Sequence, residues 1–198
     1  RDAKRLNRFR RTSTYFYPDG KPIKAGNILR NLGYAKTLRE IAADKGSSFY
    51  KGETAKDIVD TVQSAASNPG RLDLNDLAGY RVKERSAVCI TYRGLDVCGM
   101  GPPSSGGLTV GQILGMLENY DLAKMGPNSS DAWRLIGDAS RLAFADRGRY
   151  IADSDFVSVP IKGLLNKEYL KNRATLLNRK KALDTVSPGH PSFNTVHS

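Results

Sequence analysis

The chain has 198 residues, of which 39% are hydrophobic and 26% charged, a composition that excludes the intrinsically disordered class. No run approaches the roughly 18 apolar residues that cross a bilayer, so we expect one or two globular domains without a membrane-spanning helix. The formal net charge of +11 admits a polyanionic partner without requiring one.

Residues 1–27 form a basic lead-in that contains several aromatic side chains. The chain opens on Arg1-Asp2-Ala3-Lys4-Arg5 without a Met, so we expect an interior or processed start rather than a signal peptide. Residues 12–17 are β-prone. Pro18-Asp19-Gly20 predicts a turn, because Pro presets φ and Gly accepts positive φ.

The basic residues gather in two clusters, and such clusters can bind polyanions. No nucleic-acid motif accompanies them, and a basic run is usually a solvated face. We therefore expect no nucleic-acid partner, with the acidic counterparts on another part of the protein. The first cluster comprises Arg1, Lys4, Arg5, Arg8, Arg10 and Arg11, and the second comprises Lys167, Lys171, Arg173, Arg179, Lys180 and Lys181.

Two amphipathic helices are predicted after the lead-in. The first has apolar residues at helical spacing from Ile28 to Ala42, and Lys45-Gly46 supplies its end. The second follows Gly52 and ends before Asn68-Pro69-Gly70. The segment from Asp73 to Ala78 predicts a short helical turn with polar capping residues.

The next stretch changes period and predicts a β-hairpin. Residues 86–92 and 95–100 are β-prone, and Arg93-Gly94 separates them as a two-residue turn. Counting outward from this turn places Cys89 opposite Cys98 as a non-hydrogen-bonded pair, the closer of the two pair types. The two residues therefore form either a cross-strand disulfide, if the compartment oxidises, or two small buried hydrophobes.

Gly101-Pro102-Pro103-Ser104-Ser105-Gly106-Gly107 interrupts regular structure ahead of a helix predicted over residues 108–120. A Gly-rich turn that feeds a helix can bind an anion, but this one has neither a P-loop nor a nucleophile-elbow pattern. Ser104 or Ser105 would need a general base to act as nucleophile, and no His or Lys at identifiable spacing supplies one. A tight entry to the helix is the favoured interpretation.

The best-formed apolar stripe, over residues 132–143, predicts another helix, capped from the loop 126–130. A charged patch follows it, with Asp146-Arg147, Arg149 and Asp153-Ser154-Asp155. Paired carboxylates can bind Ca²⁺, but the neighbouring arginines favour a structural ion-pair network that closes the helix.

The remaining features are mostly structural. Trp133 and Tyr150 are interpreted as packing residues, and residues 167–178 predict a last, basic helix. His190 and His197 lie in a tail without a nearby Cys cluster, so we expect no metal site. A single hairpin is marginal by itself, which indicates that further strands lie outside these residues. By residue chemistry alone, the chain has no complete catalytic constellation.

Several segments, found in one order along the chain, together resemble the γ-glutamyltransferase (γ-glutamyltranspeptidase) family. The central segment runs from Tyr92-Arg93-Gly94 through the Pro-Pro-Ser-Ser-Gly-Gly core at 102–107 to Leu117-Glu118-Asn119-Tyr120-Asp121-Leu122. The other matching segments are Ala35-Lys36-Thr37-Leu38, Phe49-Tyr50-Lys51-Gly52, Asp76-Leu77-Ala78-Gly79-Tyr80, Ala143-Phe144-Ala145-Asp146-Arg147, Asp155-Phe156-Val157 and Val159-Pro160.

The resemblance implies an α/β (layered α+β) fold, the αββα sandwich of the N-terminal-nucleophile hydrolases, of which this portion would be mainly helical with a hairpin. The family's precursor cleaves itself before a Thr, which becomes the nucleophile of the small subunit and uses its own α-amine as base. Its enzymes transfer the γ-glutamyl group of glutathione or a related amide to water or to an amino-acid or peptide acceptor. No cofactor is implied.

The resemblance makes residues 1–198 part of the large subunit, with helices and hairpin in 28–185 and a tail, 186–198, that leads towards the self-cleavage site. The family's cleavage signature, Thr-Thr-His or Thr-Ser-His before an apolar strand, is not complete at 194–198, so Thr195 is not expected to be the nucleophile. The substrate-binding arginine of the family lies upstream, and the other γ-glutamyl contacts lie in the small subunit. We therefore expect no catalytic or substrate-binding residue here, and no activity from this chain alone.

Two alternatives stay open: a related amide acylase, acting for example on a β-lactam side chain, and a non-catalytic module that binds polyanions. If the protein is a γ-glutamyltransferase, its partners are the small subunit of the same precursor and a γ-glutamyl substrate. The resemblance alone implies a periplasmic or secreted location, since bacterial members of the family are usually found there.

Overall fold

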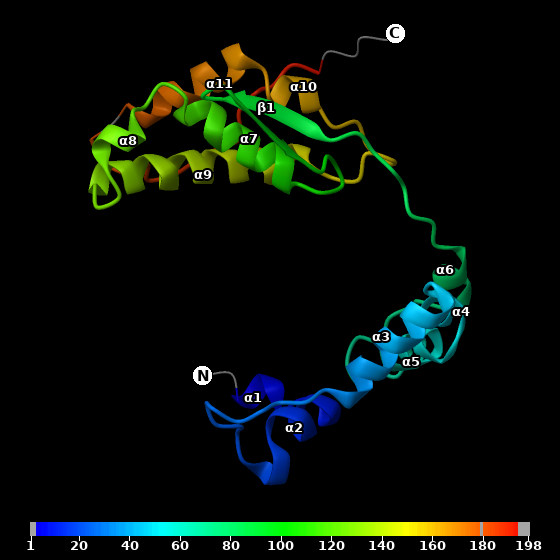
Figure 1. Ribbon diagram of the computed structural model, residues 1–198. Helices are drawn as coiled ribbons and strands as arrows, with labels where there is room; N and C mark the ends of the chain where they lie inside the picture. Colours follow the sequence, from blue (N-terminus) through cyan, green and yellow to red (C-terminus); the bar gives the residue numbers. More distant parts are fainter. Residues whose placement is uncertain (1–2, 179, 194–198) are drawn as a thin grey trace. The chain divides into compact units, whose positions relative to one another are not determined.

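The computed structural model describes residues 3–178 and 180–193, and the chain divides into two compact units (Figure 1). Unit 1 is Arg1–Val82 and unit 2 is Lys83–Ser198. The boundary falls inside the range 28–185 that the sequence pattern treats as continuous. Among the described residues, no helix combines the length and the apolar character needed to cross a membrane.

The described part of unit 1 is helical. Its short α4 packs against α3, α5 and α6, and the rings of Tyr50 on α4 and Tyr80 after α6 stack 5.7 Å apart. Ala55 and Val59 on α5 are the buried hydrophobic residues described in this unit. The elements are α1 (Ala3–Leu6), α2 (Arg10–Phe16), η1 (Pro18–Gly20), α3 (Leu32–Asp44), α4 (Ser47–Lys51), α5 (Glu53–Gln63) and α6 (Leu74–Gly79).

The prediction of a β-prone segment at residues 12–17 is wrong, because α2 covers most of it. The Tyr17 amide donates to the Ser13 carbonyl, and the Thr14 hydroxyl donates to the Arg10 carbonyl. These local hydrogen bonds satisfy polar groups of the segment, which has no partner strand among the described residues. The structural context therefore overrides the β-propensity of these residues. The turn at Pro18-Asp19-Gly20 is confirmed, with Asp19 and Gly20 at positive φ.

The helix ends follow capping chemistry more closely than they follow apolar spacing. The Asn31 side chain accepts the Tyr34 amide, so α3 begins at Leu32 and Ile28 lies outside it, 82% exposed. Lys45 and Gly46 at positive φ end α3, as predicted. The predicted turn after Asp73 is also confirmed, because Asp73 forms a reciprocal capping box at the start of α6.

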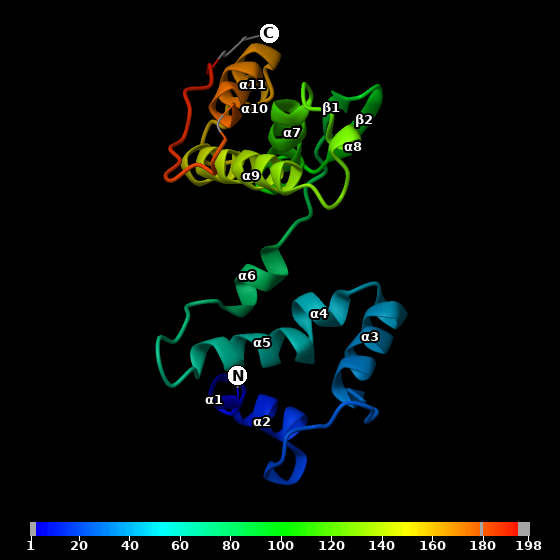
Figure 2. The ribbon, with the colours of Figure 1, turned by 90° about the vertical axis from the view of Figure 1, so that its left-hand side faces the viewer.

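In unit 2, α7 lies between α11 and the hairpin, and α9 packs against α7 (Figure 2). Met116, Leu135, Leu142 and Leu170, from these three helices, belong to one buried cluster. Burying each such side chain contributes about 1.5–3 kcal/mol. The elements are β1 (Val88–Tyr92), β2 (Leu95–Gly99), α7 (Gly106–Leu117), α8 (Leu122–Met125), α9 (Ser130–Tyr150), α10 (Ile161–Leu164), α11 (Lys167–Ala174) and η2 (Thr175–Leu177).

The predicted hairpin and its register are confirmed. β1 and β2 pair antiparallel, with Tyr92 opposite Leu95 and Cys89 opposite Cys98. Arg93 and Gly94 both have positive φ, the conformation of a type I′ turn. The face that carries Ile90 and Val97 is half-buried, and β1 and β2 both contact α7.

Three predicted helices of unit 2 are present with different ends. The first starts at Gly106, two residues early, and the last passes into the 3-10 turn η2 after Ala174. The middle one, α9, is capped by Ser129 as predicted and extends to Tyr150, beyond the apolar stripe. The packing role expected for Trp133 is wrong, because its side chain is 63% exposed and its indole N–H donates to the Pro127 carbonyl.

Candidate functional site

The loop at 101–107 makes the connection from β2 to α7, and its glycines allow close backbone approach. A Cβ on Gly107 would lie 2.8 Å from the Met100 carbonyl oxygen, and one on Gly99 would lie 2.9 Å from the Gly107 Cα. The Ser104 amide donates to the Gly101 carbonyl, and the Pro102–Pro103 peptide bond is cis. The sequence thus packs the end of β2 directly against the start of α7, as a tight helix entry requires.

The serines of this loop lack the partners of a nucleophile. The Ser105 hydroxyl oxygen accepts a 2.9 Å hydrogen bond from Arg147 Nε, and a guanidinium cannot accept a proton at ordinary pH. In the part of the chain that the structure describes, neither Ser104 nor Ser105 has a histidine, lysine or carboxylate as a hydrogen-bond partner. The loop therefore supports the start of α7 and is tied to α9 through Arg147.

A buried carboxylate, Asp146 on α9, organises the interior of unit 2 beside this loop. One oxygen, Oδ2, accepts from Gln112 Nε2 at 2.9 Å and from the Tyr169 hydroxyl at 2.6 Å. The other, Oδ1, accepts from Arg173 Nη2 at 3.1 Å and from the Gly189 amide at 2.7 Å. These donors come from α7, α11 and the tail, so Asp146 connects three segments to α9.

This arrangement corrects the interpretation of the charged patch. Asp146 is fully buried and pairs with Arg173 of α11, not with the adjacent Arg147 or Arg149. A buried ion pair needs its remaining donors and acceptors satisfied. The hydrogen bonds to Asp146 satisfy its carboxylate, whereas Arg173 Nε has no hydrogen-bond partner among the described residues. Burial and the hydrogen bond to Asp146 raise the pKa of the Tyr169 hydroxyl, so this group stays protonated and donates.

The rest of the patch is at the surface, and its Asp155 forms ion pairs with two residues from outside the patch. Asp155 accepts from Lys83 Nζ at 2.6 Å and from Arg85 Nη2 at 2.7 Å, which fastens the first residues of unit 2. The hydrogen bonds from Lys83 and Arg85 lower the pKa of the Asp155 carboxyl. Asp153 accepts the Asp155 amide at 3.0 Å. No cluster of metal-ligating residues occurs among the described residues.

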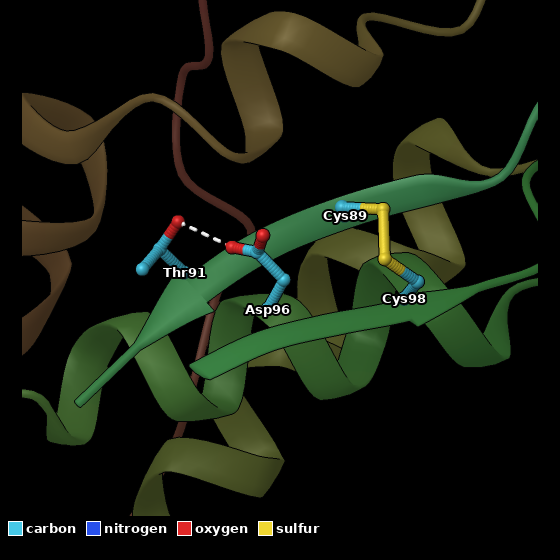
Figure 3. Close-up of a disulfide and its surroundings, with 4 residues drawn as sticks. All are labelled: Cys89, Thr91, Asp96 and Cys98. Atoms are coloured by element: carbon cyan, nitrogen blue, oxygen red, sulfur yellow. Dashed lines mark hydrogen bonds between the residues drawn. A yellow bond between two sulfur atoms is a disulfide. The ribbon is translucent and has the colours of Figure 1, made fainter. Parts of the chain in front are cut away.

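Cys89 and Cys98 are joined by a disulfide on the exposed face of the hairpin (Figure 3). Their Cα atoms are 4.1 Å apart. On the same face, the Thr91 hydroxyl donates to Asp96 Oδ1 at 2.9 Å. Both cysteines are exposed, which contradicts the alternative of two small buried hydrophobes.

The basic clusters are placed unevenly. Arg173 is buried and belongs to the Asp146 network, whereas Lys167 and Lys171 on α11 are exposed. Of the tail residues considered as ligands or nucleophile, His190 is exposed, and His197 and Thr195 lie outside the described residues. The exposed residues of the first cluster are Arg5, Arg8, Arg10 and Arg11, and the side chains of Arg1, Lys4 and Arg179 lie outside the described part.

Comparison with known proteins decides the family. The family model described as Gamma-glutamyltranspeptidase matches residues 1–197. The chain belongs to this family. It is 39% identical over 188 residues to the glutathione hydrolase proenzyme of Escherichia coli K12, covering 92% of this chain and 32% of that protein. It is also 37% identical over 182 residues to the acylase ACY 1 proenzyme of Pseudomonas sp. strain SE83, covering 91% and 32% of the two chains.

The fold agrees with the family. The chain superposes on the crystal structure of Helicobacter pylori gamma-glutamyltranspeptidase with a TM-score of 0.78 and 33% identity, covering 99% of this chain and 55% of that one. Its fold class is that of the N-terminal-nucleophile hydrolases, to which it contributes a helical portion with a hairpin. The chain spans about a third of the length of the curated relatives it matches.

The network around Asp146 was not predicted, although the sequence holds a signal for it. Asp146 follows Leu135, Ala139 and Leu142 at helical spacing, so it lies on the apolar stripe of α9. Arg173 likewise lies between Leu170 and Ala174 on the buried face of α11. A charged residue on a buried stripe must find a partner, and two such stripes with opposite charges indicate a pair.

Proposed function

We propose that the full-length protein is a γ-glutamyltransferase and glutathione hydrolase, to which residues 1–198 contribute part of the large-subunit scaffold. The observation that carries this proposal is the match of a single family model to nearly the whole chain, together with 39% identity to a glutathione hydrolase proenzyme.

In this proposal the precursor matures by cleaving itself. The hydroxyl of a Thr outside residues 1–198 attacks the preceding carbonyl carbon, its proton passes to the amine, and an ester replaces the peptide bond. Water then hydrolyses the ester, which frees a carboxyl terminus and an N-terminal Thr. The hydroxyl of that Thr then attacks the γ-glutamyl carbonyl carbon of the donor amide, so that an ester forms and the donor amine leaves with the hydroxyl proton. Water or an acceptor amine attacks this ester, takes the γ-glutamyl group and restores the Thr hydroxyl.

An activity assay on two proteins tests the proposal. The matured full-length protein is expected to release p-nitroaniline from γ-glutamyl-p-nitroanilide, and to release it faster when an acceptor dipeptide is added. Purified residues 1–198 are expected to release none. A matched full-length variant with Ala in place of the new N-terminal Thr gives the control. Turnover by residues 1–198 would contradict the proposal, and so would an inactive, uncleaved full-length protein.

A related amide acylase is the second candidate, favoured by the 37% identity to the acylase ACY 1 proenzyme. A γ-glutamyl site needs an arginine for the substrate α-carboxylate, whereas a substrate without that carboxylate does not. Comparing kcat/KM for γ-glutamyl-p-nitroanilide and for butyryl-p-nitroanilide, which lacks only the α-amino and α-carboxyl groups, separates the two. A preference for the butyryl compound would favour the acylase.

Two further expectations belong to the same proposal. We place the protein in the periplasm or outside the cell, where a disulfide such as Cys89–Cys98 persists. A polyanion-binding module remains the rival from another class, because most of the described basic side chains are exposed. Retention on heparin at low salt would support that rival, and passage without retention would remove it.

A further inference from the structure

The tail from Leu183 to Phe193 has no regular secondary structure, yet its backbone is fastened by side chains of α9 and α11. Figure 2 shows this orange-to-red segment beside α9 and α11. Asp138 accepts the Leu183 amide at 3.1 Å, and Arg141 donates to the carbonyls of Leu183 and Asp184. An irregular segment satisfied in this way has a fixed path rather than a free one.

The fastening is densest at Gly189. Its amide donates to the buried Asp146 at 2.7 Å, and its carbonyl accepts from the Tyr150 hydroxyl at 2.6 Å. Two residues earlier, the Ser187 carbonyl accepts from Arg173 at 3.0 Å. Both polar groups of one peptide residue are thus held by side chains one turn apart on α9, and Arg173 adds a second point from α11.

The position also requires a glycine. A Cβ on Gly189 would collide with the Tyr169 hydroxyl and would lie 3.0 Å from Arg173 Cδ. Tyr169 cannot easily move away, because its hydroxyl is bonded to Asp146 at 2.6 Å. After this point, Pro191 is buried and the ring of Phe193 meets Tyr150 edge-on at 6.0 Å.

We propose that Asp146, Tyr150, Tyr169 and Arg173 form a tail clamp that sets the path of the segment leading to the self-cleavage site and so sets the rate of maturation. This inference rests on the proposed function, which places the cleaved bond after the tail. The clamp residues are positioning residues that take no part in making or breaking the cleaved bond. Asp146, Tyr150 and Arg173 bind backbone groups at 187–189, and Tyr169 binds Asp146. Fixing one end of a reacting segment lowers the entropy that the reaction must lose.

The test follows self-cleavage of the full-length precursor, as the appearance of two subunits with time on denaturing gels. Tyr150→Phe removes the hydroxyl bonded to Gly189 and keeps the ring that meets Phe193. Since one hydrogen bond is lost, we expect cleavage to slow by about three- to tenfold. Gly189→Ala is expected to slow cleavage further, because it displaces Tyr169 as well.

Tyr120→Phe is the matched control. It removes a hydroxyl of the same kind in the same unit, which donates to Asn178 Oδ1 at 2.7 Å and to the Ala174 carbonyl at 3.3 Å. This hydroxyl bonds neither to a clamp residue nor to 187–189. Its cleavage rate is expected to stay within about twofold of the unchanged precursor. Once matured, the Tyr150→Phe enzyme is expected to keep kcat and KM per mole of small subunit, because the clamp acts before catalysis.

The outcomes separate the two proposals. Cleavage of Tyr150→Phe at the unchanged rate would overturn the clamp and leave the proposed function standing. Equal slowing by Tyr120→Phe, or a matured Tyr150→Phe enzyme with altered kcat, would show a general loosening of unit 2 and also overturn it. An unchanged precursor that never cleaves would overturn the proposed function, and the clamp's role with it.

Discussion

Units 1 and 2 are built from helices of similar amphipathic pattern but differ in what those helices bury. Among the described residues, thirteen hydrophobic side chains are buried in unit 2, from Leu108 to Leu183, whereas unit 1 has two, Ala55 and Val59. On α3, Leu32 is 75% exposed and Leu38 is 47% exposed. Helical periodicity therefore identifies a face that can be buried, but only a facing element turns it into a core.

The largest expected effect comes from separating the units. Residues 83–198 are expected to fold alone, with dispersed amide signals in two-dimensional NMR and a cooperative thermal transition, because α7, α9 and α11 share one core. Residues 1–82 are expected to show narrowly dispersed amide signals and no cooperative thermal transition, because few of their apolar side chains are buried. A cooperative transition in residues 1–82, or its absence in 83–198, would reverse the comparison.

A pair of leucine truncations probes the same difference within the 198-residue chain. Leu142 is 1% exposed in the core of unit 2, so Leu142→Ala is expected to lower the free energy of unfolding by about 2–5 kcal/mol. Leu38→Ala, at a half-exposed site on α3, is expected to change it by less than about 0.5 kcal/mol. Urea unfolding followed by circular dichroism measures both, and equal losses would show that unit 1 is also tightly packed.

How far the sequence predicts each feature depends on how local its cause is. The hairpin register follows from the two-residue turn at Arg93-Gly94, so it could be predicted from neighbouring residues. The segment at 12–17 had the composition of a strand and became the helix α2, because a strand needs a distant partner and a helix does not.

The Asp146 network lies at the other extreme. Asp146 and Arg173 are 27 residues apart and on different helices, so their pairing depends on how α9 and α11 pack. The adjacent Arg147 offered a local partner, which made the wrong pairing plausible. Burial separates the two arginines: Arg147 is exposed and Arg173 is on the face that the core covers.

Reduction of the disulfide gives a smaller effect that also distinguishes the units, since both cysteines lie in unit 2. The disulfide joins residues nine positions apart, and losing such a link is expected to cost unit 2 about 2 kcal/mol. Cys89→Ser with Cys98→Ser is expected to lower the transition of residues 83–198 to the same degree, and reductant should then have no further effect. Mass spectrometry of unreduced, alkylated protein checks the premise: two alkylated thiols would contradict the disulfide.

The smallest expected effect is at the start of unit 2, where Asp155 holds Lys83 and Arg85. Hydrogen bonds from Lys83, then from Arg85, hold the pKa of Asp155 below its ordinary 3.8. A carboxyl whose pKa is lowered in the folded protein contributes stability above its unfolded pKa and loses it as the pH falls through the folded value. The contribution should therefore be complete at pH 7 and begin to fade as the pH falls below about 4, and salt should weaken it because these charged groups are exposed.

An NMR titration of the Asp155 side-chain carbon measures this shift directly. Lys83→Ala is expected to move the pKa of Asp155 back towards its ordinary value, and Arg85→Ala to do so by a smaller amount, in the order of the two causes. Lys162→Ala, which removes an exposed lysine of unit 2 that is not an ion-pair partner of Asp155, provides the control and should leave the titration unchanged. If neither Lys83→Ala nor Arg85→Ala moves the titration, then Asp155 does not fasten the first residues of unit 2. The first residues of unit 2 would then be held by the pairing of the hairpin and its contacts with α7, and not by ion pairs.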